Sequence, residues 1–196
     1  PFHYYGITDI SIDGELLEED ASVNSLTSQE RIDRVIEKTQ FYGSDGGIVR
    51  GLIFCSRVDE CVELSIGLNR AGLRTIALSG ENSELERDEA ISRLETEDHN
   101  IRLDYILSVD IFNEGIDIPS VNQIVMLRPT QSAVVFVQQL GRGLRLADNK
   151  KFLTVIDFIG NYKNSYLVPI ALYGDTSYNK DSLRKLIAGG SSFIPG

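Results

Sequence analysis

The sequence is poor in the residues that build disulfide frameworks and metal sites. It has two cysteines and two histidines among 196 residues, and neither a CxxC nor an HExxH pattern occurs. Small secreted scaffolds need several disulfides, and zinc sites need clustered Cys and His ligands. The sequence therefore indicates no disulfide scaffold and no metal site, and its few cysteines favour a reducing, cytoplasmic setting.

Long apolar stretches are also missing. No run approaches the roughly 18 apolar residues of a membrane-spanning helix, and the opening residues PFHYYGITD lack the basic and apolar regions of a signal peptide. We therefore expect no membrane association. Because the chain opens with Pro1 and its only methionine is Met126, we expect an excised or processed piece.

Phosphate-binding loops are absent as well. No GxxxxGK[ST] pattern occurs, so the chain has no Walker A loop. Residues 88–91 read DEAI, but a Walker B acid follows an apolar strand. Here Asp88 lies within a charged, capped helix, and we interpret the stretch as a solvated helix face.

Positive charge is scarce overall, with 19 basic and 29 acidic residues and a net charge of -10. Taken alone, that balance argues against nucleic acid as a partner, because phosphate contacts need Lys and Arg. The excess is local, however: residues 1–45 carry three basic and ten acidic groups, residues 81–98 carry two and eight, and the remainder has a charge of +3. The charge therefore does not exclude nucleic acid, and the two acidic segments are expected to lie away from any phosphate-binding surface.

Strand-like and helix-like segments alternate along the chain. After a lead-in at 1–26 with at most short strands, apolar runs predict strands at 48–56, 73–79, 103–109, 121–127, 152–158 and 167–173. Helical spacing predicts helices over about 28–42, 57–71, 84–96, 132–145 and 180–188. Three capping-box patterns support helix starts, at Thr27 with Glu30, Ser56 with Asp59, and Ser83 with Glu86.

This alternation predicts an α/β fold, a parallel β-sheet with helices on both faces. We expect a lead-in segment with one helix at 1–45, a core domain at 46–175 and a closing helix and tail at 176–196. Core candidates are Phe54, Leu68, Ile106, Leu107, Val125, Val135, Val155 and Phe158, with Cys55 and Cys61 as small apolar fillers. Ligands of such folds bind at the carboxyl ends of the strands.

The densest cluster of polar side chains is QQLGRGLR at 138–145. Arg142 and Arg145 lie three apart and share a helix face, and the planar guanidinium suits phosphate oxygens. With Gly141 and Gly143 allowing another surface to come close, the pair suits a phosphoryl transition state. A solvated helix end paired with carboxylates is the alternative.

A second cluster, NEGIDIP at 113–119, follows a buried strand. Asp117 lies between two isoleucines at the mouth of the predicted sheet, where its carboxylate could bond a ribose hydroxyl. An Asx-turn residue that only holds the loop is the alternative.

The segments that carry these clusters, taken in their order along the chain, resemble the conserved motifs of helicases. Residues 53–57 (IFCSR) are similar to motif IV, 106–119 to motif V and the Gln138-x-x-Gly141-Arg142-x-x-Arg145 pattern to motif VI. The chain thus resembles the C-terminal RecA-like domain of superfamily 2 DEAD/DEAH-box helicases over about 48–160. Its Gln-first motif VI is most similar to the type I and III restriction-enzyme and excision-repair branch, which acts on DNA.

The resemblance implies a P-loop-NTPase-like domain without its own P-loop, which shares ATP and Mg²⁺ with an N-terminal RecA-like domain of the same protein. It implies that Arg142 and Arg145 reach the γ-phosphate as arginine fingers, supported by Gln138. It implies further contacts with the nucleotide from Glu114, Gly115, Asp117 and Gly141.

The resemblance also implies contacts with a nucleic-acid backbone from Ser56, Arg57, Ser79, Gly80 and Ser108. Many family members carry a motif V Thr where this chain has Val109. Ser108 is the nearest hydroxyl, but side chains alternate along a strand, so it should face the other way.

We therefore expect the C-terminal half of an ATP-dependent DNA helicase or translocase, inactive as this fragment alone. The alternatives are a non-catalytic helicase-like docking module, an RNA-acting helicase and an unrelated α/β nucleotide or sugar-phosphate enzyme.

Overall fold

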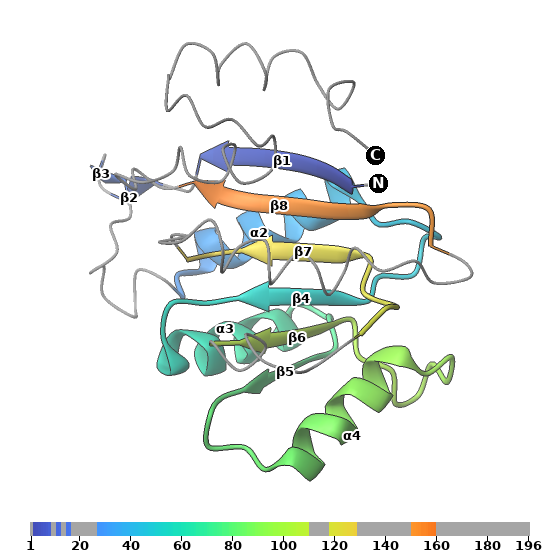
Figure 1. The fold of residues 1–196 in the computed structure, drawn as a ribbon. Coiled ribbons are helices and arrows are strands. Elements are labelled where there is room, and N and C mark those ends of the chain that lie inside the picture. Colours follow the sequence, from blue (N-terminus) through green and yellow to red (C-terminus); the bar gives the residue numbers. More distant parts are fainter. Residues whose placement is uncertain are drawn as a thin grey trace, which may run out of the picture.

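Six parallel strands form one sheet in the computed structural model, which describes residues 2–8, 11–12, 15–16, 27–109, 118–128 and 150–159. Their order across the sheet is β1-β8-β7-β4-β6-β5 (Figure 1). Their bounds are β1 Phe2–Thr8, β4 Gly51–Phe54, β5 Thr75–Leu78, β6 Tyr105–Ser108, β7 Gln123–Met126 and β8 Leu153–Ile159. A separate antiparallel pair joins β2 (Ser11–Ile12) and β3 (Glu15–Leu16).

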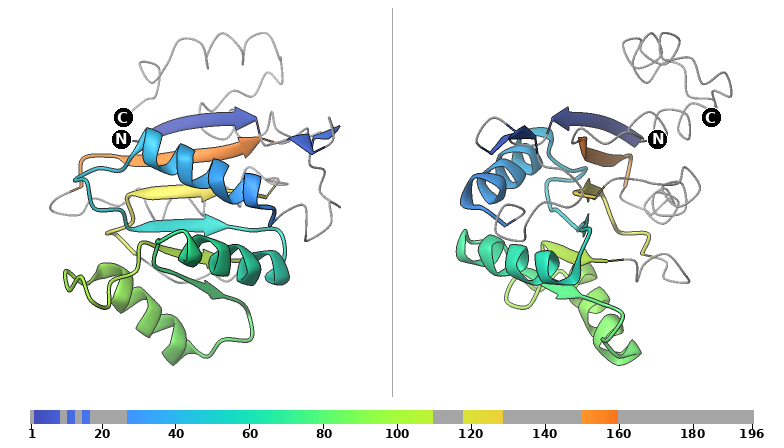
Figure 2. Two further views of the ribbon diagram at one scale, coloured as in Figure 1. Left: turned by 180° about the vertical axis from the view of Figure 1, so that it is seen from behind. Right: turned by 90° about the vertical axis from the view of Figure 1, so that its left-hand side faces the viewer.

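Helices cover both faces of the sheet, as the sequence predicts. The helices α2 (Gln29–Tyr42) and α3 (Val58–Arg70) lie side by side on one face (Figure 2). Helix α4 (Glu84–Glu95) packs against the opposite face through Ala90 and Leu94. None of these three described helices has the length and hydrophobicity needed to cross a membrane.

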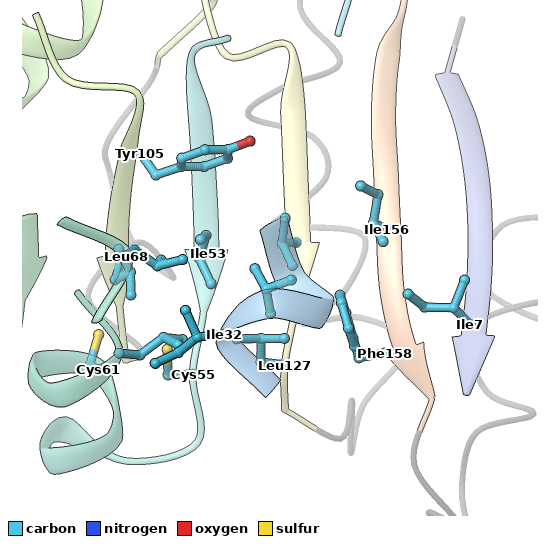
Figure 3. Close-up of a cluster of buried hydrophobic side chains, with 14 residues drawn as sticks. Ile7, Ile32, Ile53, Cys55, Cys61, Leu68, Tyr105, Leu127, Ile156 and Phe158 are labelled. Atoms are coloured by element: carbon cyan, nitrogen blue, oxygen red, sulfur yellow. The ribbon is translucent and has the colours of Figure 1, made fainter. Parts of the chain in front are cut away.

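The central strands are buried on both sides, which explains their unbroken apolar sequences. In β4, Leu52 and Phe54 face the α4 side, and Ile53 faces the cluster beneath α2 and α3 (Figure 3). Seven of the eight core candidates are fully buried, and the eighth, Val135, lies outside the described residues.

The two cysteines are buried in the cluster under α2 and α3. A hydrogen bond with Cys61 and burial raise the pKa of the Cys55 thiol, so it stays protonated. Both residues therefore act as small packing groups, as predicted.

The N-terminal segment contributes more to the sheet than the sequence predicts. Phe2–Thr8 is a full strand, paired with β8 from Phe2 opposite Leu153 to Thr8 opposite Ile159, where we expected at most short strands. Aromatic and β-branched residues favour a strand there, and pairing covers the otherwise open edge of β8. Helix α2 also buries Ile32 and Val35 against the sheet. Where the domain begins and ends along the chain stays a prediction.

Two of the three predicted helix starts differ in detail. Ser28, not Thr27, caps α2 by accepting from the Arg31 N–H at 3.3 Å. Helix α3 begins after Arg57 without a side-chain cap, and Glu60 Oε2 accepts from the Ser56 N–H at 2.8 Å.

The Ser83–Glu86 capping box at the start of α4 is confirmed. Asp88 and Glu89 are exposed on this helix, which supports the rejection of a Walker B motif. The helices predicted at 132–145 and 180–188 and the strand predicted at 167–173 lie outside the described residues.

Candidate nucleic-acid interface

The predicted nucleic-acid-binding residues gather at the carboxyl edge of three adjacent strands. Phe54 of β4 pairs in register with Ser108 of β6, and Ser108 pairs with Leu78 of β5. The turn at Ser56 and Arg57 and the loop at Ser79 and Gly80 follow β4 and β5 directly. All five residues of the set therefore lie at one edge of the sheet.

A buried ion pair supports the Ser56–Arg57 turn from below. Arg31 Nη1 donates to Glu60 Oε1 at 2.7 Å, and both side chains are fully buried. The other oxygen of Glu60 accepts from the Ser56 N–H, while Arg31 Nη2 donates to the Leu127 carbonyl at 3.2 Å. This pair joins α2, α3, the turn after β4 and the residue after β7, which fixes where the turn sits.

Arg57 lies at the surface and is held by Asp59. Its Nε donates to Asp59 Oδ1 at 3.1 Å and its Nη2 to Asp59 Oδ2 at 2.7 Å. This pairing raises the pKa of the Arg57 guanidinium and lowers the pKa of the Asp59 carboxyl, so both groups carry full charge at neutral pH. A charged, half-exposed guanidinium at this edge is suited to phosphate oxygens.

The Ser79–Gly80 loop is fixed by side chains that follow it. Asn82 Oδ1 accepts from the Ser79 N–H at 2.8 Å, and the Ser79 hydroxyl accepts from the Glu81 N–H at 3.3 Å. Arg87 of α4 donates to the carbonyls of Ser79 and Gly80 at 3.4 and 3.1 Å. Arg87 therefore orders the loop.

Ser108 differs from the other four residues because its side chain is fully buried. Its hydroxyl has no hydrogen-bond partner in the part of the chain that the structure describes. It shares the α4 face with its register neighbours, whereas Val109 packs on the α2–α3 side, as strand alternation requires. A phosphate contact from the Ser108 hydroxyl stays a prediction, and it requires movement of the groups that cover it.

The predicted nucleotide-binding residues lie outside the described residues; they are Glu114, Gly115, Asp117, Gln138, Gly141, Arg142 and Arg145. Residues that flank these segments belong to the described ranges. Ile118 is buried on the α4 side, Arg128 lies over the Phe54 ring at 6.0 Å, and Lys150 Nζ donates to the Pro119 and Val121 carbonyls at 2.7 and 3.0 Å. Within the described ranges no cluster of His, Cys, Asp or Glu could hold a metal ion.

The parallel sheet, its two helical layers and the loops at one carboxyl edge define a RecA-like α/β domain. Residues 30–147 match the family described as the helicase conserved C-terminal domain. The chain belongs to this family, which confirms the resemblance seen in the sequence.

Similar proteins carry the names of ATP-dependent helicases and of ATP-dependent RNA helicases. The chain is 30% identical over 142 residues to the "Putative ATP-dependent helicase IRC3" of Saccharomyces cerevisiae, covering 71% of this chain and 20% of that protein. It is 27% identical over 126 residues to the "ATP-dependent RNA helicase SrmB" of Haemophilus influenzae, covering 64% and 27%. The chain thus spans about a fifth of the length of the yeast relative.

Solved structures show the same fold. The C-terminal domain of the DEAD-box protein Dbp5 superposes with a TM-score of 0.58 at 17% identity, covering 96% of this chain and 86% of that one. The DEAD-box protein SrmB of E. coli, solved with the regulator of ribonuclease activity A, gives 0.55 at 21% identity, covering 80% and 77%. At these identities the likeness concerns the fold alone.

Proposed function

We propose that this chain is the C-terminal half of an ATP-dependent superfamily 2 helicase or translocase, in which an N-terminal RecA-like domain of the same protein supplies the phosphate loop. The observation that carries the proposal is the gathering of Ser56, Arg57, Ser79, Gly80 and Ser108 at one sheet edge. The family match and the absence of a Walker A pattern support the same assignment.

The nucleotide lies between the two domains in this proposal. Arg142 and Arg145 stabilise the charge that develops on the γ-phosphate, since their planar forks match its oxygens. Gln138 supports them, and the ribose and phosphates lie near Glu114, Gly115, Asp117 and Gly141. Mg²⁺ enters with ATP and is held mainly by the N-terminal domain.

The nucleic acid lies along the carboxyl edge of β4, β6 and β5, where the interface contacts the phosphate backbone. We assign DNA as the polymer, because EGIDIP and the Gln-first motif VI resemble the DNA-acting branch. The RNA helicase names among the relatives favour RNA as the second candidate. Backbone contacts do not read sequence, so they suit a motor that moves along any strand.

The test is ATP hydrolysis by the full-length protein with no nucleic acid, with single-stranded DNA and with RNA of the same sequence. We expect stimulation by DNA, and loss of hydrolysis in Arg142→Ala and in Arg145→Ala. Arg70→Ala, which removes an exposed arginine at the end of α3, is the matched control and should hydrolyse normally. Hydrolysis unaffected by both motif VI variants would refute the proposal, and stimulation by RNA alone would overturn the choice of DNA.

A further inference from the structure

Asp59 occupies a pair of N–H donors on Arg57 that suits a phosphate equally well. The two bonds, at 3.1 and 2.7 Å, use Nε and one terminal nitrogen of the guanidinium. Carboxylates and phosphates bind this fork in the same bidentate geometry. A phosphate at this place on Arg57 therefore has to displace the Asp59 carboxylate.

The position of Arg57 makes this pairing possible. Arg57 is the residue before α3 and has an extended backbone, with φ -140° and ψ 152°. Its side chain can therefore fold back over the first turn of the helix, where Asp59 lies. Within a helix, residues two apart do not face each other.

The ion pair is weak enough to exchange. The Arg57 and Asp59 side chains are 40% and 53% exposed, and exposed pairs contribute little net free energy because water competes for both partners. The neighbouring acid Glu60 is not available as a substitute, since both its oxygens are engaged below the turn.

We propose that Asp59 sets the affinity of this edge for nucleic acid by holding Arg57 in the unbound protein and releasing it to a backbone phosphate. The inference rests on the proposed function, in which Arg57 contacts nucleic acid. Asp59 is then a specificity-determining residue that disfavours weak contacts: only a strand held at several other points displaces it.

The chain offers a matched control for this idea. Glu63 lies one helical turn beyond Asp59 and is exposed, whereas the acid that pairs with Arg57 is Asp59. Neutralising either acid removes one negative charge from the same helix surface. The Asp59 change removes the carboxylate that holds Nε and Nη2 of Arg57.

The experiment measures the binding of a labelled single-stranded oligodeoxynucleotide to the full-length protein by fluorescence anisotropy. Asp59→Asn should tighten binding about threefold to fivefold, the range expected for release of one exposed pair. Glu63→Gln should change it by less than about 1.5-fold, since the ion pair with Arg57 is made by Asp59 and exposed charges contribute little. In the Arg57→Ala background, Asp59→Asn should have no more effect than Glu63→Gln.

The outcomes separate the inference from the proposed function. If Arg57→Ala leaves binding unchanged, Arg57 makes no contact and the inference is wrong, while the proposed function still stands or falls on the hydrolysis test of Arg142→Ala and Arg145→Ala. If Arg57→Ala weakens binding but Asp59→Asn equals Glu63→Gln, the interface stands and the role of Asp59 is wrong. Thermal unfolding of each variant confirms that the domain is folded, and Asp59→Ser, which keeps a hydroxyl in the first turn, gives a second test of the same release.

Discussion

Arg31 and Glu60 form an ion pair at 2.7 Å in which neither side chain is exposed to solvent. They come from α2 and α3, and each also bonds a backbone group, the Leu127 carbonyl and the Ser56 N–H. The pair therefore links the position of two helices to the turn that carries Arg57.

Replacing one partner should strongly destabilise the domain. Glu60→Leu leaves the Arg31 guanidinium buried without its carboxylate, and Arg31→Met leaves the Glu60 carboxylate buried without its guanidinium. Each change should lower the free energy of unfolding by about 3–5 kcal/mol. Urea unfolding of the two variants measures this loss.

The double variant is the informative control. An apolar pair often replaces a buried ion pair with little loss, so Arg31→Met with Glu60→Leu should be more stable than the sum of the single changes predicts. Recovery should be incomplete, because the Ser56 N–H and the Leu127 carbonyl lose their partners. Strict additivity of the two costs would contradict the view that the pair acts as one unit.

Gly51 is required by the ring of Tyr105 on the neighbouring strand. A Cβ at Gly51 would overlap two ring carbons, and the ring is fixed because its hydroxyl donates to Gln123 Oε1 at 2.5 Å. Gly51→Ala should lower the free energy of unfolding by about 1–3 kcal/mol, as overpacking does. At Gly80 an added Cβ would meet open space. Gly80→Ala should therefore leave the free energy of unfolding nearly unchanged in the same urea titration.

The buried carboxyl of Asp157 should make stability depend on pH. Burial raises its pKa from 3.8 to about 6, while the Tyr4 hydroxyl donates to it at 2.7 Å. The folded state then holds the proton more tightly than the unfolded state, so stability should fall as pH rises from about 4 to about 6 and level off above. Asp157→Asn should remove this loss, a gain on the order of 2–3 kcal/mol at neutral pH.

Unfolding free energies of wild type and Asp157→Asn, measured between about pH 4.5 and pH 7.5, test the sign of this effect. Asp88→Asn removes an exposed carboxylate on α4 and should keep the wild-type slope. Parallel curves for wild type and Asp157→Asn would show that Asp157 does not titrate in this window.

Continuous apolar runs predicted the buried strands, because a strand covered on both faces needs apolar residues at every position. The same logic could not find β1. Its partner β8 lies about 150 residues away, as the pairing of Phe2 with Leu153 shows, and only the tertiary structure offers that open edge. Arg31 and Glu60 likewise look like solvated helix residues in sequence, since each is buried only because the other is present.

The candidate site was predictable as a set of motifs, but not as a set of contacts. Sequence order placed Ser56, Ser79 and Ser108 at strand ends, and the parallel sheet brought them to one edge. The sequence alone could not show that Asp59 holds Arg57, because that contact depends on the extended backbone before α3. The burial of Ser108 likewise follows from its face of the sheet and not from the motif it belongs to.

In the proposed function, this chain completes an ATP site but carries no phosphate-binding loop of its own. The most direct measurement compares ATP turnover by the isolated 196-residue chain, the full-length protein and full-length Arg142→Ala. We expect no turnover by the isolated chain, turnover by the full-length protein, and a loss on the order of 10³-fold in Arg142→Ala with ATP still bound. Turnover by the isolated chain, or full-length turnover that Arg142→Ala leaves unchanged, would contradict this role of the chain.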